Sequence, residues 1–330
     1  MKRRTLIAAA TGSLLYFVLS ERSPATDSRT VGILIGLAND AETQARSTAF
    51  EKGLRADGWI QGKNLRLEYR YANGDPKLMQ AYANEFVAMK VDCILGHSTP
   101  VVAALARATK TIPIVFVSVS DPIGSGFIKS MAHPGGNITG FTILQPTIPG
   151  KHLSMLHEIA PNLTHVALMY NPHSVPDAGT FFMRAFIDAA NEYKIKPIIA
   201  EVNGPKDIEA AISGLAVKPG GGLITVPDNF LTLHRDLLIS LAAKYRIPTV
   251  YPYRYFAEAG GLISYGVDAV DLFQRATDYV SRILRGAKPA DLPVQGPTKF
   301  ELVINVRTAQ ALGLTIPRFM LAGADKILEK

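Results

Sequence analysis

The chain has 330 residues, a formal net charge of +7 and a hydrophobic content of 48%, with 19% charged residues. This composition excludes a disordered chain, and the length suffices for two domains that each bury a core. Lysine and arginine form no run after residue 4, so no nucleic-acid partner is predicted. The single cysteine, Cys93, excludes a disulfide framework. We also expect no metal site, because no two of the seven histidines are four residues apart.

The N-terminal segment has the layout of a secretory signal. A basic start, Lys2 to Arg4, precedes an apolar run over residues 6–19 and then a polar stretch. The apolar run is short for a membrane span. We therefore predict a signal peptide and leader over residues 1–27 and a periplasmic mature protein. An uncleaved anchor helix is the alternative.

Short apolar runs alternate with segments of helical periodicity from residue 31 onward, which predicts βα units around parallel sheets. Two series of five runs are separated by a helix-like connection at 150–159, and they predict two similar α/β lobes. The first series is 31–37, 65–71, 92–96, 113–119 and 138–144, and the second is 165–170, 196–202, 221–226, 247–251 and 261–265.

The last third of the chain begins with a clear helix. Asp268 is placed to cap its start and Gly286 lies just past its end, with apolar residues recurring at helical spacing between them. A proline-punctuated, extended segment follows. A final helical region is predicted to hold residues 308–314 and 324–330.

Polar residues collect where the predicted strands end. In open parallel sheets, ligands bind beyond the carboxyl ends of the strands. Pro100 follows a Ser-Thr pair, so the first backbone N–H groups of its helix are free to face an anion such as a carboxylate, unless the pair serves only as a cap. The candidate ligand-binding residues are Ser98, Thr99, Ser118, Ser120 and Asp121 in the first series, and Asn171, Asp228, Asn229, Tyr251 and Tyr265 in the second.

Asp228 has two open roles. It is placed to cap the helix that follows it, and its carboxylate is also suited to face a ligand ammonium group. The two roles do not exclude one another.

The glycine-rich stretch 133–141, HPGGNITGF, raises the possibility of a phosphate-binding loop. Just before it, Gly124 and Gly126 half-match a dinucleotide fingerprint, but Lys129 stands where the third glycine belongs. We therefore interpret the stretch as a tight turn into a strand, and we expect no cofactor. Common nucleophile and metalloprotease motifs are also missing from the sequence, which favours a binding protein over an enzyme.

Several long motifs then resemble one family. They are FEKGLRADGWIQGKNLRLEYRYANGD, ATKTIPIVFVSVSDPIGSGFIKSMAHPGGNITGF, EAGGLISYGVD and RILRGAKPADLPVQGPTKFELVINVRTAQALGLTIP. Together they resemble the ABC transporter substrate-binding protein family that includes tryptophan- and tyrosine-binding members, from residue 31 onward. The resemblance implies an α/β, type I periplasmic-binding fold: two doubly wound parallel-sheet lobes joined by a hinge.

In that fold we expect residues 28–143 and 267–330 to form the first lobe and residues 144–266 the second. Crossings between the lobes are expected at 137–144 and near Gly266. By position, the resemblance assigns a ligand carboxylate to four hydroxyl residues of the first lobe, Ser98, Thr99, Ser118 and Ser120. It assigns further ligand contacts to Asn171, Asp228 and Tyr265 of the second lobe. The loop 251–254 could supply an aromatic wall. His97 beside them departs from the usual pattern.

The expected function is therefore a monomeric solute receptor that delivers a small carboxylate-bearing molecule, such as an aromatic amino acid, to an ABC transporter permease. The ligand-sensing domain of a regulatory or signalling protein shares this fold and is one alternative. A secreted α/β enzyme is the other.

Overall fold

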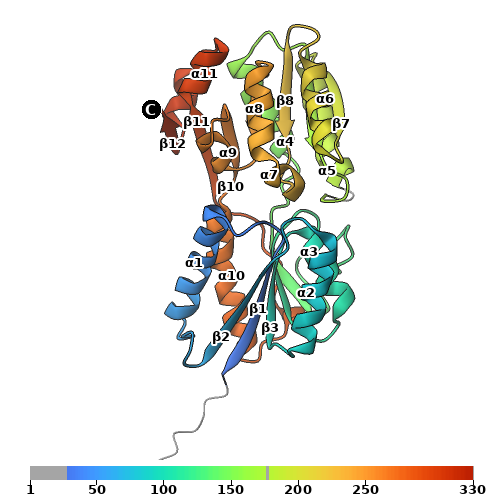
Figure 1. The fold of residues 1–330 in the computed structure, drawn as a ribbon, viewed down its shortest axis with the longest axis vertical. Coiled ribbons are helices and arrows are strands. Elements are labelled where there is room, and N and C mark those ends of the chain that lie inside the picture. The colour runs from blue at the N-terminus through green and yellow to red at the C-terminus, as the bar shows by residue number, and fades with distance from the viewer. Residues whose placement is uncertain (1–27, 176–177, 330) are drawn as a thin grey trace, which may run out of the picture.

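The computed structural model describes residues 28–175 and 178–329. The predicted signal peptide and leader, residues 1–27, lie outside this part of the chain, so they stay a prediction. Among the described residues, no helix combines the length and the apolar character that crossing a bilayer requires. Figure 1 shows two lobes stacked along the long axis of the molecule.

The first lobe is built on a five-stranded parallel sheet in the order β2-β1-β3-β4-β5. Nearly every position of its central strands is buried, as expected for a parallel sheet covered on both faces. Its strands are β1 (Arg29–Ile35), β2 (Leu65–Tyr71), β3 (Cys93–His97), β4 (Ile114–Val119) and β5 (Ile138–Thr142), and its helices are α1 (Ala41–Ala56), α2 (Pro76–Ala88), α3 (Thr99–Ala108) and α10 (Ala269–Leu284).

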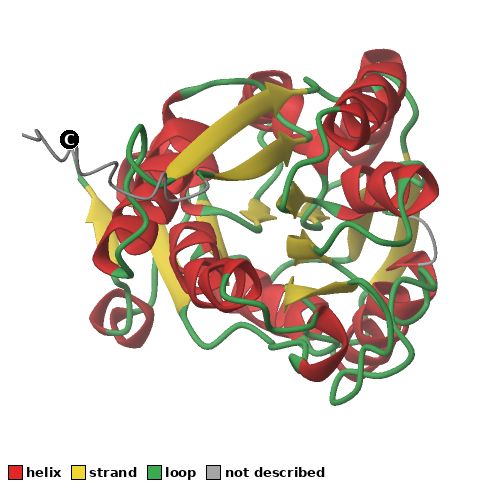
Figure 2. Ribbon diagram, turned by 90° about the horizontal axis from the view of Figure 1, so that it is seen from below, coloured by secondary structure: helices red, strands yellow, loops and turns green. Residues whose placement is uncertain are grey.

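Helices cover both faces of this sheet. The helices α1 and α10 pack side by side on one face, and α2 and α3 pack together on the other. Trp59, just after α1, donates a hydrogen bond from Nε1 to Ser281 Oγ of α10 at 3.0 Å. Seen along the long axis, most of the strands lie in the interior with helices around them (Figure 2).

The second lobe is built on a seven-stranded sheet in the order β12-β11-β10-β9-β8-β6-β7. Strand β11 runs antiparallel to β10, so this sheet is mixed. Its strands are β6 (His165–Tyr170), β7 (Lys196–Glu201), β8 (Gly221–Thr225), β9 (Thr249–Tyr251), β10 (Ile263–Val267), β11 (Phe300–Asn305) and β12 (Lys326–Leu328), and its helices are α4 (Ile148–Ile159), α5 (Ala178–Glu192), α6 (Pro205–Leu215), α7 (Asn229–Leu233), α8 (Arg235–Lys244), α9 (Arg254–Glu258), α11 (Val306–Leu312) and α12 (Arg318–Ala322).

The C-terminal third of the chain differs from the expected division. We expected residues 267–330 to return to the first lobe, and α10 and the short 3₁₀ helix η1 (Pro289–Asp291) do pack there. Strands β11 and β12, however, extend the second sheet. The chain therefore passes between the lobes after β5, after β10 and before β11. In Figure 1 the orange helix α10 lies in the lower lobe, while the red C-terminal elements lie in the upper one.

The ten strand-like runs are confirmed, because each overlaps a strand of the structure. The helix predicted from Asp268 is also confirmed, and its cap accepts hydrogen bonds from the backbone N–H groups of Val270 and Asp271 at 2.9 and 3.1 Å. The predicted helix at 324–330 is wrong for residues 326–328, which form β12.

The glycine-rich stretch is a turn that leads into β5, as predicted. Gly135 has φ +76°, and the nearby Lys129 N–H donates to the Pro134 carbonyl at 3.0 Å. Gly140, inside β5, has φ +152°, and a Cβ there would collide with the backbone of Phe116 on β4. Backbone geometry therefore accounts for these glycines.

Candidate functional site: the interlobe cleft

The carboxyl ends of strands from both sheets come together between the lobes, as the switch-point rule predicts. We call this region the interlobe cleft. The first lobe contributes residues 40–47, 97–99 and 118–121, and the second contributes 171–174, 228–235 and 253–255. Contacts between these two sets show that the lobes lie against each other.

Ser98 and Asn229 meet across the cleft. The Asn229 Nδ2 group donates a hydrogen bond to Ser98 Oγ at 2.8 Å. Ser98 is buried and has φ +85°, a conformation that a serine rarely adopts. Gly36 provides the space for this pair, because a Cβ there would lie 2.6 Å from Asn229 Nδ2 and 2.8 Å from Ser98 Oγ.

The other predicted hydroxyl residues of the first lobe are close by and buried. The Ser120 N–H donates to Thr99 Oγ1 at 3.3 Å, so these two residues bind each other. Ser118 has φ +59°, and its buried Oγ has no hydrogen-bond partner among the described residues. A backbone in this region costs free energy and is often found at functional sites.

Asp121 serves its own loop. Its Oδ1 accepts hydrogen bonds from the backbone N–H groups of Ile123 and Gly124 at 3.1 and 2.8 Å. This is the local turn that an aspartate commonly stabilises. The contact gives Asp121 a structural role at the edge of the cleft.

Asp228 and Asn171 form a tie within the second lobe. Oδ1 of Asp228 caps α7 by accepting from the N–H groups of Phe230 and Leu231, at 2.7 and 3.2 Å. Oδ2 accepts from the Asn171 N–H at 2.6 Å. Burial raises the pKa of Asp228 to about 6, although these N–H groups act to lower it. In the described part of the chain, Asp228 forms no ion pair.

The side chain of Asn171 is also used inside the second lobe. Its Nδ2 donates to the Val202 carbonyl at 2.7 Å, and its Oδ1 accepts from the N–H groups of His173 and Ser174. Asn171 therefore shapes the loop that holds Asp228.

The two predicted tyrosines lie differently from expectation. Tyr251 is buried in the core of the second lobe, where its ring stacks on Phe256 with a centroid distance of 5.0 Å. The prediction that Tyr251 contacts the ligand is therefore wrong, because core side chains surround it, and within the loop 251–254 the aromatic residue at the cleft is Tyr253. Tyr265 stacks on Phe300 and accepts a hydrogen bond from Lys151 Nζ at 2.6 Å. It braces α4 against β10.

Tyr253 and Tyr255 are aromatic side chains that reach the cleft beside Arg46. They stack on each other at 5.3 Å between centroids. Two arginines lie over the Tyr255 ring, Arg46 of the first lobe and Arg235 of the second, with their Cζ atoms 5.7 and 5.8 Å from the ring centroid. Such distances are typical of cation–π contacts.

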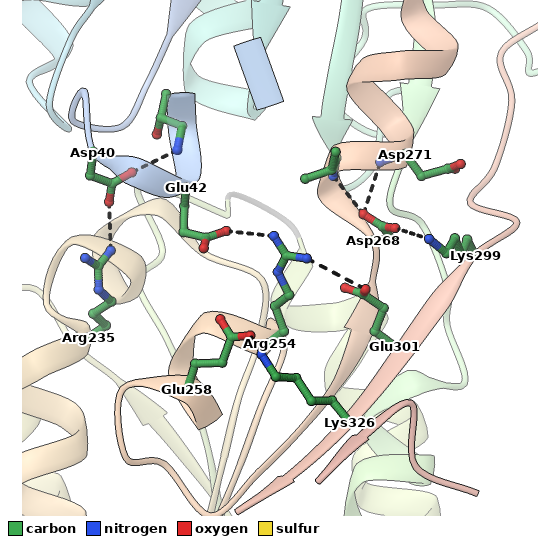
Figure 3. Close-up of polar contacts among 12 residues, drawn as sticks. Asp40, Glu42, Arg235, Arg254, Glu258, Asp268, Asp271, Lys299, Glu301 and Lys326 are labelled. Atoms are coloured by element: carbon green, nitrogen blue, oxygen red, sulfur yellow. Dashed lines mark hydrogen bonds and ion pairs between the residues drawn. The ribbon is translucent and has the colours of Figure 1, made fainter. Parts of the chain in front are cut away.

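Ion pairs that the sequence reasoning missed also cross the cleft. Arg235 Nη1 lies 2.9 Å from Asp40 Oδ2, and Arg254 Nη2 lies 3.4 Å from Glu42 Oε2. Figure 3 shows Arg254 between Glu42 of α1 and Glu301 of β11. Asp40 caps α1 and Glu42 lies in its first turn, so charge complementarity holds the start of this helix against the second lobe.

Two cavities border the cleft. One of about 310 Å³ is lined by both lobes, including Asn73, Met79 and Pro100 of the first and Asn171, Asn203 and Phe230 of the second. The other, of about 10 Å³, lies beside Arg46, Tyr253 and Asp268. A larger cavity of about 560 Å³ lies at the amino end of β8. Residues of the second lobe alone line this third cavity, so lobe movement would not enclose a ligand there.

Arg46 is the residue of the cleft that sequence reasoning missed most clearly. It is only 3% exposed, and its Nε has no hydrogen-bond partner among the described residues. Its position on the buried side of α1, four residues before Phe50, is a signal that could have found it. Residues 28–175 and 178–329 contain no cluster of three or more metal-ligating side chains.

A family model described as ABC transporter substrate binding protein matches residues 30–328. A curated relative, the tyrosine-binding protein of Clostridioides difficile (strain R20291), is 27% identical over 266 residues, which are 80% of this chain and 75% of the relative.

Two solved structures are similar to this chain over most of its length. A conserved domain protein of Vibrio cholerae O1 biovar El Tor is 31% identical with a TM-score of 0.84, covering 91% of this chain and 99% of that chain. The ABC domain of Streptococcus pneumonia in complex with L-Trp is 24% identical, also with a TM-score of 0.84, covering 91% of this chain and 100% of that one. The second likeness shows the fold.

Proposed function

We propose, from the premise that the chain belongs to the ABC transporter substrate-binding protein family, that it is an extracytoplasmic receptor for a small zwitterionic solute of the aromatic amino acid class. It binds the solute between its lobes as a monomer and delivers it to a membrane permease, without chemical turnover. The relative that is named for tyrosine binding supports this solute class.

The observation that carries the proposal is a pair of buried, unpaired charges of opposite sign in the cleft. Arg46 of the first lobe and Asp228 of the second are 3% and 4% exposed, and neither forms an ion pair within the described part of the chain. The charges of both act on the hydroxyl of Tyr253, whose pKa is raised first of all by burial. A buried charge is costly unless it is paired.

An amino acid carries the two charges that would complete such a pair. Its ammonium group is suited to the carboxylate of Asp228, and its carboxylate to the first lobe, which contributes the positive charge of Arg46 and the hydroxyl residues 98, 99 and 120. The ligand then contacts both lobes at once. Because it interacts more strongly with the closed arrangement than with an open one, it shifts the population toward closure, which the permease would recognise.

Closure is proposed to occur about the three chain crossings, at residues 143–147, 267–268 and 297–299. Hinges of this kind concentrate the dihedral change in a few residues at the ends of elements. The contacts Asn229–Ser98 and Arg235–Asp40 belong to the closed arrangement.

The test is calorimetric titration of the protein with L-tyrosine, L-tryptophan and 3-(4-hydroxyphenyl)propanoate, which lacks the ammonium group of tyrosine. We expect micromolar or tighter binding of at least one amino acid and much weaker binding of the propanoate. Asp228→Asn should weaken amino acid binding by about tenfold or more, since charge-assisted hydrogen bonds contribute about 1.5–3 kcal/mol.

The variant should bind the propanoate as the wild type does. Thermal melting of Asp228→Asn serves as the control, because the change also touches the cap of α7. If both solute types lose affinity equally while the fold is intact, Asp228 is only a cap. If neither amino acid binds the wild type, the proposed solute class is wrong.

A further inference from the structure

Helix α1 places an arginine inside the protein rather than on its surface. Arg46, Phe50 and Leu54 are spaced four residues apart and share the buried side of the helix. The two apolar residues belong to the core of the first lobe, whereas Arg46 lies at the cleft end of the same stripe. An arginine is almost never fully buried unless it is paired.

The acidic groups around Arg46 are committed to other partners. Asp40 binds Arg235 at 2.9 Å, and Glu42 binds Arg254 at 3.4 Å. Asp268, which lines the small cavity beside Arg46, binds Lys299 at 2.6 Å (Figure 3). The guanidinium of Arg46 therefore has Tyr255 as its neighbour in the cleft but no carboxylate within ion-pair distance in the described structure.

Other buried polar atoms at this end of the first lobe also have no hydrogen-bond partner among the described residues. They are Thr43 Oγ1 on α1, His97 Nδ1 at the end of β3 and Ser118 Oγ at the end of β4. His97 pairs in register with Val117 of β4, so His97 and Ser118 lie at the same end of the sheet. Such groups cost free energy when they are buried without partners, which marks a place prepared for a polar ligand.

The imidazole of His97 is neutral at pH 7. Burial, and then the charge of Arg46, lower the pKa of His97 to about 3. His97 therefore adds no second positive charge beside Arg46, and one of its ring nitrogens carries a hydrogen that it can donate.

We infer that Arg46 is the anion-binding residue of the receptor, and that its guanidinium binds the carboxylate of the solute with the His97 imidazole and the Ser118 hydroxyl beside it. This inference rests on the proposed function and names the residue of the first lobe that selects for an anionic group. Arginine suits this task because its planar fork of N–H donors matches the two oxygens of a carboxylate.

The position of Arg46 also gives an order of events. The carboxylate binds to the first lobe, and Tyr255 and Tyr253 of the second lobe then close over it. In this structure the cavity beside Arg46 measures about 10 Å³, roughly one water molecule, so the carboxylate needs the lobes to move further apart before it enters.

The experiment compares Arg46→Met, Arg46→Lys and a matched control, Arg55→Met, which changes an exposed arginine of the same helix. Titrations use L-tyrosine and tyramine, which is tyrosine without its carboxylate. Arg46→Met should weaken L-tyrosine binding by about 30-fold or more, as expected for removing one partner of a buried charge pair. Arg46→Lys should retain part of the affinity, Arg55→Met all of it, and tyramine binding should not respond to Arg46→Met.

Urea unfolding without solute separates a binding role from a structural one. If Arg46 serves binding, the urea midpoint of Arg46→Met should equal or exceed that of the wild type, because the variant removes a buried charge that lacks an ion-pair partner. A folded Arg46→Met protein that still binds L-tyrosine with wild-type affinity would overturn the inference. A lowered midpoint with unchanged affinity would do the same.

A last experiment tests the anion site at Arg46 without L-tyrosine. It stays informative if L-tyrosine does not bind the wild type, a result that would contradict the proposed solute class and not the anion site. Melting temperatures are measured in sodium acetate and in sodium chloride at equal ionic strength. Acetate should raise the melting temperature of the wild type and of Arg55→Met, but not that of Arg46→Met. An equal response of all three proteins contradicts an anion site at Arg46.

Discussion

Asn229 of the second lobe and Ser98 of the first are joined by a hydrogen bond of 2.8 Å between Nδ2 and Oγ. Each of them follows the end of a strand in its own sheet, where the sequence predicted ligand contacts. The bond links the two lobes directly, because its two partners lie on separate lobes. It therefore couples the predicted binding residues to the position of the lobes.

Asn229→Ala should make closure less favourable. A net hydrogen bond contributes about 0.5–1.5 kcal/mol, so we expect the affinity for L-tyrosine to fall by about two- to tenfold. The measurement is titration calorimetry, with small-angle scattering at saturating L-tyrosine to compare radii of gyration. Asn84→Ala, on the exposed side of α2, is the control. An unchanged dissociation constant would show that the bond adds nothing to closure.

The ion pairs Asp40–Arg235 and Glu42–Arg254 should act as a salt-sensitive latch. In Asp40→Asn with Glu42→Gln, both pairs lose their negative charge, while the asparagine oxygen can still cap α1. Partly exposed pairs contribute about 0.2–1 kcal/mol each and are screened by salt. We expect scattering to show a larger mean radius for the double variant and a weaker dependence of that radius on sodium chloride.

Asp278→Asn, which removes a pair on the exposed surface of α10, is the control for the latch. If the wild type and the double variant expand equally as salt rises, the two pairs do not hold the lobes.

Gly140→Ala should destabilise the first lobe strongly. A Cβ at this position would collide with the backbone of Phe116, and φ is +152°. We expect the free energy of unfolding to fall by more than about 2 kcal/mol in urea titrations. Gly136→Ala, four residues earlier in the same stretch, should be nearly neutral, because open space surrounds it. Equal effects of the two changes would refute the role given to Gly140.

Asp228 should make the protein gain stability on mild acidification relative to Asp228→Asn. Burial raises its folded pKa to about 6 from an ordinary value of 3.8. Between about pH 6 and pH 4, Asp228 is therefore protonated in the folded protein but ionised in the unfolded chain. The contribution to the free energy of unfolding accordingly rises as the pH falls through that window, by at most about 3 kcal/mol.

The quantity to measure is the difference in unfolding free energy, wild type minus Asp228→Asn, from urea titrations between pH 7 and pH 4. Taking this difference cancels the contributions of His97 and His152, which both proteins share. Burial lowers the pKa values of these two histidines to about 3 and 4, so they reduce the free energy of unfolding as the pH falls below about 6.5. A difference that stays constant, or that falls toward pH 4, would contradict the raised pKa.

The sequence predicted the βα framework because buried parallel strands appear as continuous apolar runs, such as residues 113–119. It predicted the cap at Asp268 because capping is a local interaction. The strand at 326–328 was missed, since three residues show no periodicity and pairing with β11 decides their structure. Tyr251 was misplaced for a similar reason, because a three-residue strand does not reveal which way its side chains point.

Arg46 illustrates the limit of sequence reasoning within the site. Read alone, an arginine in a helix rich in charged residues looks like a surface residue. Its burial depends on α10 and on Tyr255, which lie more than 200 positions further along the chain. The four-residue spacing to Phe50 is the one local signal for its burial, but the distant partners that cover it leave no pattern in the sequence, whereas the hydroxyl residues at strand ends follow from topology alone.

The shared C-terminal third has a consequence for how this chain folds. The first sheet lacks α10 on one face until residue 284 has been synthesised, and the second sheet lacks β11 and β12 until residue 328. Each lobe is therefore incomplete until a segment far along the chain has been synthesised, and both acquire their final contacts between segments that are distant in sequence. Such non-local pairing slows folding and leaves apolar faces exposed to chaperones or aggregation in the meantime.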